Sequence, residues 1–275
     1  MLRKLLKYDL LSVWRNGWGT IVVMMACTVA TTLFARVLNG MENSQSGFRN
    51  SMEVVGALTI VLGLFCLLGC IATVGILVFW RFYKNFFTDE GYLTFTLPVK
   101  RSTLLISKML NSAIWLIAYA VLFVLCVVAY FTFGGFKTNV AKEVFEGLLE
   151  RASKCNGWQW AYTAVGTVSL ASYLFLYISQ FQFAIAWGSS ISKKAKMLST
   201  VCVLLVTELV CSFLIPGGLG EVALSTREML TGYWRSDRHE MVVLIMLVLA
   251  VMRSAVGLAF TYMTLDKISR KLNIE

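Results

Sequence analysis

Residues 110–136 read LNSAIWLIAYAVLFVLCVVAYFTFGGF and contain no charged side chain. A helix rises about 1.5 Å per residue, so about 20 apolar residues cross the hydrocarbon core of a membrane, which is about 30 Å thick. This stretch is therefore long enough and apolar enough to cross a bilayer as one helix.

Five further long apolar runs lie along the chain, and three of them each contain one charged residue, which is Arg36, Glu208 or Arg253. With residues 110–136 they give six predicted spans, at approximately 19–38, 54–80, 110–136, 158–190, 197–216 and 241–265. The run 158–190 is longer than a span requires, so we expect it to tilt or to extend into the interface. We therefore predict an all-α integral membrane protein, with a six-helix transmembrane domain over residues 19–275.

The composition of the whole chain agrees with a membrane protein. Hydrophobic residues make up 58% of the 275 residues and charged residues 15%, whereas soluble domains carry about 25% charge. The single histidine, His239, leaves no multi-histidine metal site and no Ser/His or Cys/His relay. The seven cysteines include no C-x-x-C pair. We predict that this chain is not an enzyme and holds no metal or other cofactor.

Lysine and arginine are distributed unequally over the two sides of the predicted bundle. Six spans put both termini on one side, and that side has fifteen Lys and Arg against five acidic residues, whereas the other has nine of each. By the positive-inside rule the basic side is cytoplasmic. We predict a multi-pass protein of the plasma (cytoplasmic) membrane with both termini in the cytoplasm. Topology and anionic lipid account for the net charge of +10, so nucleic acid is not predicted as a partner.

Two polar segments adjoin the spans. Residues 2–15 place leucines on one helical side and basic residues on another, which predicts an amphipathic interface helix over residues 1–18. Residues 215–220, IPGGLG, interrupt the fifth span. They predict a short broken extracellular segment between spans five and six, which is either re-entrant or an interfacial turn.

The two cytoplasmic connections differ in character. In the first, Thr88 with two acids behind it has the chemistry of a helix start, and Pro98 that of a stop. The apolar-aromatic element between them either docks on a partner or lies flat on the membrane. The second connection is a basic turn, which is either a further contact point or a positive-inside anchor. Its lysines are Lys193, Lys194 and Lys196.

Glu208 and Arg253 are the charged residues in the middle of predicted spans. Each costs roughly 2.5 to 3.5 kcal/mol in a membrane if it is alone. Counted from the cytoplasmic flanks, they lie at depths of about 18 and 20 Å, so we predict an intramembrane ion pair between consecutive spans. Such a pair stabilises the packing of the two helices, acts as a gate, or lines a polar pathway. Other polar residues of span four, Ser172, Ser179, Gln180 and Gln182, predict interhelical hydrogen bonds rather than a substrate site.

The segment 88–108, TDEGYLTFTLPVKRSTLLISK, resembles the connection between spans two and three of ATP-binding-cassette exporter permeases of the ABC-2 type, also called the type V fold. In that family an acid is followed by a short helix, a Leu-Pro pair, an arginine and a lysine. The resemblance implies a coupling helix over residues 90–97, seated in a groove of a separate nucleotide-binding subunit. The implied coupling residues are Glu90, Gly91, Tyr92, Leu93, Phe95, Leu97, Pro98, Arg101 and Lys108.

The same resemblance implies the partners. The chain is expected to be a permease subunit that pairs with a second permease, the same or a related chain. Two separate ATPase subunits would bind ATP and Mg, because this chain has no phosphate-binding G-x-x-x-x-G-K-[ST] loop. The small loops look most like permeases of Gram-positive bacteria, some of which export or confer resistance to antimicrobial peptides. Two alternatives stay open: a membrane sensor or scaffold without transport, and an ion-coupled secondary transporter that uses Glu208.

Overall fold

A computed structural model of the chain describes most residues, and every element in the described part is an α-helix. The described residues are 2–40, 46–88, 91, 96, 99–134, 142, 146–147, 157–191, 196–215 and 239–270. No strand occurs among them, which confirms the predicted all-α class.

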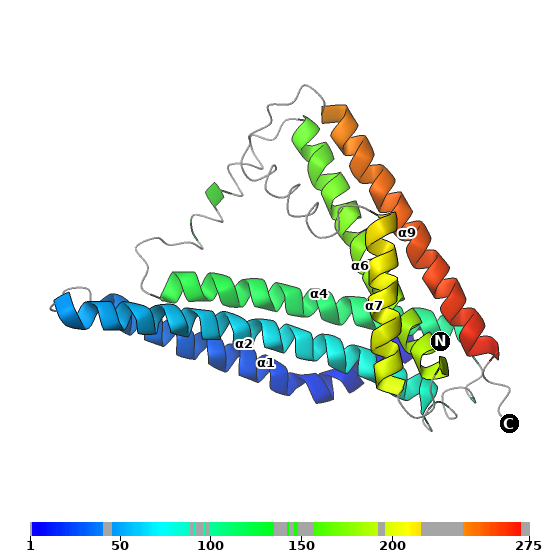
Figure 1. The fold of residues 1–275 in the computed structure, drawn as a ribbon, viewed down its shortest axis with the longest axis horizontal. Coiled ribbons are helices and arrows are strands. Elements are labelled where there is room, and N and C mark those ends of the chain that lie inside the picture. The colour runs from blue at the N-terminus through cyan, green and yellow to red at the C-terminus, as the bar shows by residue number, and fades with distance from the viewer. Residues whose placement is uncertain are drawn as a thin grey trace. The chain divides into compact units, whose positions relative to one another are not determined.

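Six long helices contain most of the described residues (Figure 1). They are α1 (Leu2–Gly40), α2 (Ser46–Phe87), α4 (Arg101–Phe133), α6 (Gly157–Ile191), α7 (Lys196–Leu214) and α9 (His239–Arg270). By length and composition, each of the six could cross a membrane. Each predicted span falls on a different helix, so the prediction of six membrane-spanning helices agrees with the structure. The span predicted at 158–190 matches α6 almost residue for residue.

The N-terminal helix is longer than either of the two segments predicted there. The interface helix predicted over residues 1–18 and the span predicted from residue 19 lie on one continuous helix, α1, of 39 residues. At 1.5 Å per residue it is about 58 Å long, which exceeds the thickness of the hydrocarbon core. Hydrophobic periodicity alone did not reveal the continuity, because a helix can pass from an interface into a bilayer without a break.

The chain divides into two compact units, each with its own core. Residues Lys7–Val78 and Ile114–Lys154 form one unit, in which α1, α2 and part of α4 pack together. Its Tyr119 hydroxyl donates to the Gly17 carbonyl at 2.9 Å and lies 2.7 Å from Thr20 Oγ1. A Cβ at Gly63 would lie 2.5 Å from Thr31 Cγ2. This close approach of α2 to α1 needs the glycine, as in many membrane helix pairs.

The other unit comprises Met1–Leu6, Phe79–Ala113 and Cys155–Glu275, and within it α6 packs against both α7 and α9. Two glycines allow these contacts. A Cβ at Gly188 of α6 would lie 2.3 Å from Thr200 Cα of α7, and one at Gly257 of α9 would lie 2.7 Å from the Phe175 ring. Glycine therefore sets the distance between α6 and both of its neighbours.

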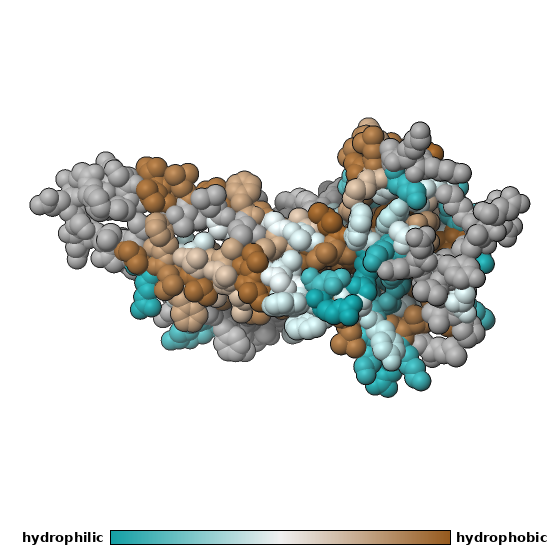
Figure 2. Space-filling view, turned by 90° about the horizontal axis from the view of Figure 1, so that it is seen from below, coloured by the Kyte–Doolittle hydropathy of each residue, from teal (hydrophilic) through white to brown (hydrophobic). Residues whose placement is uncertain are grey.

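Large apolar side chains cover much of the described surface, as the brown areas of Figure 2 show. Phe213 of α7 is 85% exposed, and Tyr262 of α9 is 74% exposed. A water-soluble protein rarely leaves so many large apolar side chains uncovered, whereas helices that face lipid do so routinely.

Candidate functional site

The carboxylate of Glu208 is held by a neighbouring helix. Glu208 lies on α7, and its Oε2 accepts a hydrogen bond of 2.7 Å from Nε2 of Gln180 on α6. The same Nε2 lies 3.4 Å from Thr207 Oγ1. The close packing of α6 on α7 brings these groups together. One carboxylate oxygen is thus bonded, and the carboxylate keeps further acceptor capacity.

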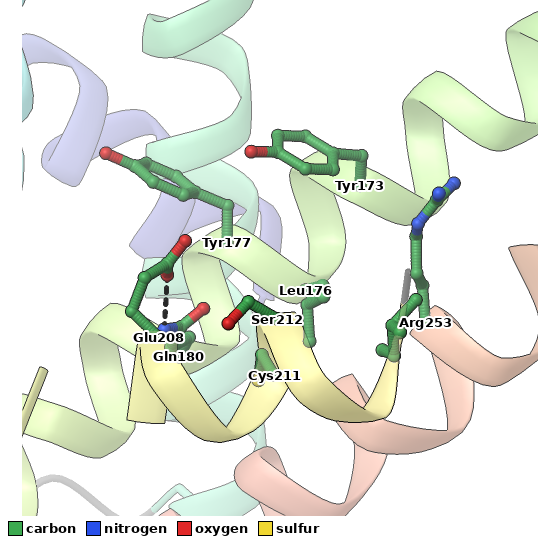
Figure 3. A pocket seen from close by; sticks show the side chains of 9 residues that line it. Tyr173, Leu176, Tyr177, Gln180, Glu208, Cys211, Ser212 and Arg253 are labelled. Atoms are coloured by element: carbon green, nitrogen blue, oxygen red, sulfur yellow. Dashed lines mark hydrogen bonds between the residues drawn. The ribbon is translucent and has the colours of Figure 1, made fainter. Parts of the chain in front are cut away.

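A pocket of about 130 Å³ opens beside this carboxylate, between α6, α7 and α9 (Figure 3). It is lined by Tyr173, Leu176, Tyr177, Gln180, Glu208, Cys211, Ser212, Ile215 and Arg253. The α6 residues among them recur every three or four positions, so they lie on one face of that helix. Figure 3 shows the two tyrosine rings along this face, opposite the side chains of α7.

Arg253 lines the same pocket from α9, but its guanidinium lies away from Glu208 (Figure 3). It is only 1% exposed, and its Nη1 donates to Ser169 Oγ at 2.9 Å. Ser169 and Gln180 are eleven residues apart on α6, which is about 16 Å along the helix axis. The two charged groups are therefore anchored at different levels.

Glu208 and Arg253 thus bond to different residues of α6, Glu208 to Gln180 and Arg253 to Ser169. The ion pair between Glu208 and Arg253 stays a prediction.

The other polar residues of α6 differ in their hydrogen-bond partners. Gln180 makes the predicted interhelical hydrogen bonds, whereas the hydroxyls of Ser172 and Ser179 donate to carbonyls of their own helix. Gln182 is 1% exposed, and its side-chain atoms have no hydrogen-bond partner within the described part of the chain. Sequence reasoning did not select Ser169, Tyr173 and Tyr177. Their spacing with Gln180 along one helical face was the signal that could have found them.

The predicted coupling segment is described only in part. Glu90, Tyr92, Leu93, Phe95, Leu97 and Pro98 lie outside the described residues. Gly91 is described and buried, and its N–H donates to the Thr88 carbonyl at 2.8 Å. A Cβ at Gly91 would lie 3.0 Å from the Phe86 carbonyl oxygen. The Thr88 hydroxyl donates to the Lys84 carbonyl in the last turn of α2, and Gly91 is helical.

Both ends of this connection are fixed in one hydrophobic cluster, named here the connection cluster. Its buried members are Phe79, Phe82 and Phe86 of α2, Leu104 and Leu105 of α4, Ile185 of α6 and Ile268 of α9. Tyr177 and Phe181 of α6 pack against it, and the Phe79 and Phe181 rings stack at 4.3 Å between centroids. The connection cluster therefore joins the segment 88–100 to four helices.

Two residues of the predicted coupling motif lie in the first turns of α4. Arg101 begins that helix, and its Nη1 donates to the Ser269 carbonyl in the last turn of α9 at 2.8 Å. A cation suits this place, because the last carbonyls of a helix lack partners within it. Lys108 is buried, with 7% of its surface exposed.

The connection predicted as the second cytoplasmic one lies at the α6–α7 junction. Lys193 and Lys194 are outside the described residues, and Lys196 is the first residue of α7. The Lys196 carbonyl accepts a hydrogen bond from Thr200 Oγ1 at 2.8 Å, and Ser199 Oγ donates to the Gly188 carbonyl at 2.8 Å. At its other end α7 stops at Leu214. The predicted broken segment begins there and lies beyond the described residues from 216 onward.

Neither a metal-binding group among the described residues nor a known relative indicates a function for the chain. Within the described ranges, no group of three or more His, Cys, Asp or Glu side chains could hold a metal ion. No known protein family, characterised protein or solved structure matches the chain. Functional conclusions therefore depend on the residues and the geometry given above.

Proposed function

We propose that this chain is the membrane-spanning permease subunit of an ATP-driven exporter of the ABC-2 type. It would work beside a second permease, the same or a related chain, and with two separate ATPase subunits that bind ATP and Mg. The motif over residues 88–108, the six apolar helices and the basic excess on one side support this proposal. Antimicrobial peptides or drugs are the substrates that the resemblance suggests, at the plasma membrane with both termini in the cytoplasm.

The observation that carries the proposal is the anchoring of the segment 88–100. It lies between α2 and α4, and both flanks are packed into the connection cluster together with α6 and α9. The Arg101 bond to the Ser269 carbonyl ties the same place to the end of α9. A displacement of this segment by a partner would therefore move four helix ends together, because packed cores resist local deformation.

The test is purification of the membrane complex with whatever ATPase it binds. We expect an ATP-hydrolysing subunit to co-purify, and Tyr92→Glu or Leu93→Glu to abolish the stimulation of its ATPase activity by the permease. A charge placed in an apolar contact leaves that charge without compensation. Lys142→Glu, at a site where the side chain is 72% exposed, is the control and should retain stimulation.

Two results would count against the proposal. One is a stable complex without a nucleotide-hydrolysing subunit. The other is normal stimulation in both glutamate variants, which would leave the segment lying on the membrane surface.

An ion-coupled transporter is the second candidate, and the Glu208 carboxylate at an open pocket favours it. That function predicts uptake or efflux in sealed vesicles without ATP, and loss of transport in Glu208→Gln. Transport that strictly requires ATP would exclude it.

A further inference from the structure

We infer that the pocket between α6, α7 and α9 binds one organic ammonium group carried by an amphiphile. This inference is independent of what drives transport, because it concerns equilibrium binding to Glu208 and its neighbours. The ammonium could come from a free amphiphilic amine or from a lipid with an amine headgroup. Both sources present the same chemistry to the pocket.

The carboxylate is the first reason. Glu208 lies midway along an apolar helix, and its side chain is exposed instead of being buried in the bundle. Gln180 satisfies one oxygen with a neutral N–H, which does not balance the negative charge. A carboxylate in a membrane is costly unless a cation or a proton compensates it. An ammonium group would bring the charge and the donors that this carboxylate can still accept.

The aromatic wall is the second reason. Tyr173 and Tyr177 lie one turn apart on the face of α6 that borders the pocket, and Figure 3 shows both rings on the Glu208 side of Arg253. Aromatic faces attract organic cations, and aromatic side chains are used to bind ammonium ligands such as choline and methyl-lysine. Leu176 and Ile215 add apolar surface for the methylene groups next to the nitrogen.

The size of the pocket limits the ligand. A cavity of about 130 Å³ is close to the roughly 150 Å³ that holds one benzene-sized molecule. It is larger than a bare sodium ion or a single water molecule needs. It accommodates an amine head with a few attached atoms, and the rest of an amphiphile would lie in the membrane.

Arg253 limits the charge of the ligand. Its guanidinium is buried and fixed by Ser169, so the pocket has a permanent positive charge on the side away from Glu208. Repulsion is strong where water is excluded. A ligand with one ammonium group can keep away from this charge, whereas a short diamine cannot. The pocket should therefore prefer monoamines to diamines.

The experiment is equilibrium binding of radiolabelled dodecylammonium to the whole chain in phosphatidylcholine nanodiscs, with empty nanodiscs subtracted. Dodecanol, dodecyl sulfate and the short diamine N-dodecyl-1,3-diaminopropane serve as competitors. We expect unlabelled dodecylammonium to compete at least about tenfold better than each of these, since charge-assisted hydrogen bonds are about twice as strong as neutral ones. This comparison uses the unmodified protein, so it does not depend on the folding of any variant.

Three variants identify the carboxylate as the binding group. Glu208→Gln keeps the size of the side chain and should weaken dodecylammonium binding at least about tenfold, whereas Glu208→Asp keeps the charge and should restore part of it. Glu146→Gln removes a carboxylate that is 63% exposed outside the pocket and should leave binding unchanged. Equal competition by dodecanol, or unchanged affinity in Glu208→Gln, would overturn the inference.

A further arm separates the two sources of the ammonium group. Nanodiscs that contain phosphatidylethanolamine should suppress dodecylammonium binding if the lipid headgroup enters the pocket. Unchanged binding in those nanodiscs would assign the pocket to a free amphiphilic amine. Either result supports an ammonium site and names its natural source.

Discussion

Replacement of Gly188 by alanine is the most direct test of how α6 meets α7. The added Cβ would lie 2.3 Å from Thr200 Cα and 2.6 Å from Thr200 N, whereas carbon atoms in contact are normally about 3.5 to 4.0 Å apart. The helices would have to separate by at least about 1 Å, because backbone atoms cannot rotate away as a side chain can. Overpacking of this kind costs about 1 to 3 kcal/mol, and we expect the upper end of that range.

The matched control is Gly166→Ala on the same helix. A Cβ there meets nothing within 4 Å, so alanine should be neutral or should stabilise α6 by up to about 1 kcal/mol through its better helix propensity. The two variants make the same chemical change with opposite expected signs.

The assay is thermal unfolding in detergent, followed by circular dichroism, with the two variants and the parent chain measured side by side. We expect Gly188→Ala to unfold at a lower temperature than the parent and Gly166→Ala at the same or a higher one. If Gly188→Ala were as stable as Gly166→Ala, the close approach of α6 and α7 would be incorrect. The position of Glu208 against Gln180 would then lose its structural basis.

Further predictions concern single polar contacts. Tyr119→Phe should lower the free energy of unfolding by about 1 kcal/mol in a denaturant titration, because one net hydrogen bond is lost. Gln180→Leu should cost about 1 to 3 kcal/mol in the same assay, since it removes the bond to Glu208, and Gln180→Glu should cost more because two carboxylates would then face each other. Arg101→Ala should reduce ATPase stimulation without preventing ATPase binding, as seen by activity and co-purification. Arg253→Met should reduce the ratio by which dodecylammonium competes better than N-dodecyl-1,3-diaminopropane in the binding assay.

Much of the fold could be predicted from the sequence, because a membrane span is a long apolar run with few or no charged side chains. The limits of α6 and α7 follow closely from the apolar runs 158–190 and 197–216, of which the second contains one charged residue, Glu208. The continuity of α1 could not be predicted, since an amphipathic start and an apolar continuation have different patterns but the same backbone. Hydropathy reports which solvent a segment prefers and does not report whether a helix is interrupted.

The residues of the candidate site were easier to predict from the sequence than their arrangement in space. Glu208, Arg253 and Gln180 stand out because polar groups are rare in apolar runs. Their partners depend on how three helices are rotated and shifted against one another. That packing is governed by contacts such as Gly188 with Thr200 and Gly257 with Phe175, which a single sequence does not reveal.

The position of Tyr177 has a thermodynamic consequence. Its ring packs against Phe79 and Phe181 beside the connection cluster, with 4.6 Å between the Tyr177 and Phe181 centroids, and it also forms part of the pocket wall. One side chain thus belongs to both places. Suppose that a ligand in the pocket favours one rotamer of Tyr177, and that a partner bound at the connection cluster favours the same rotamer. Binding at each place then makes binding at the other more favourable by the same free energy.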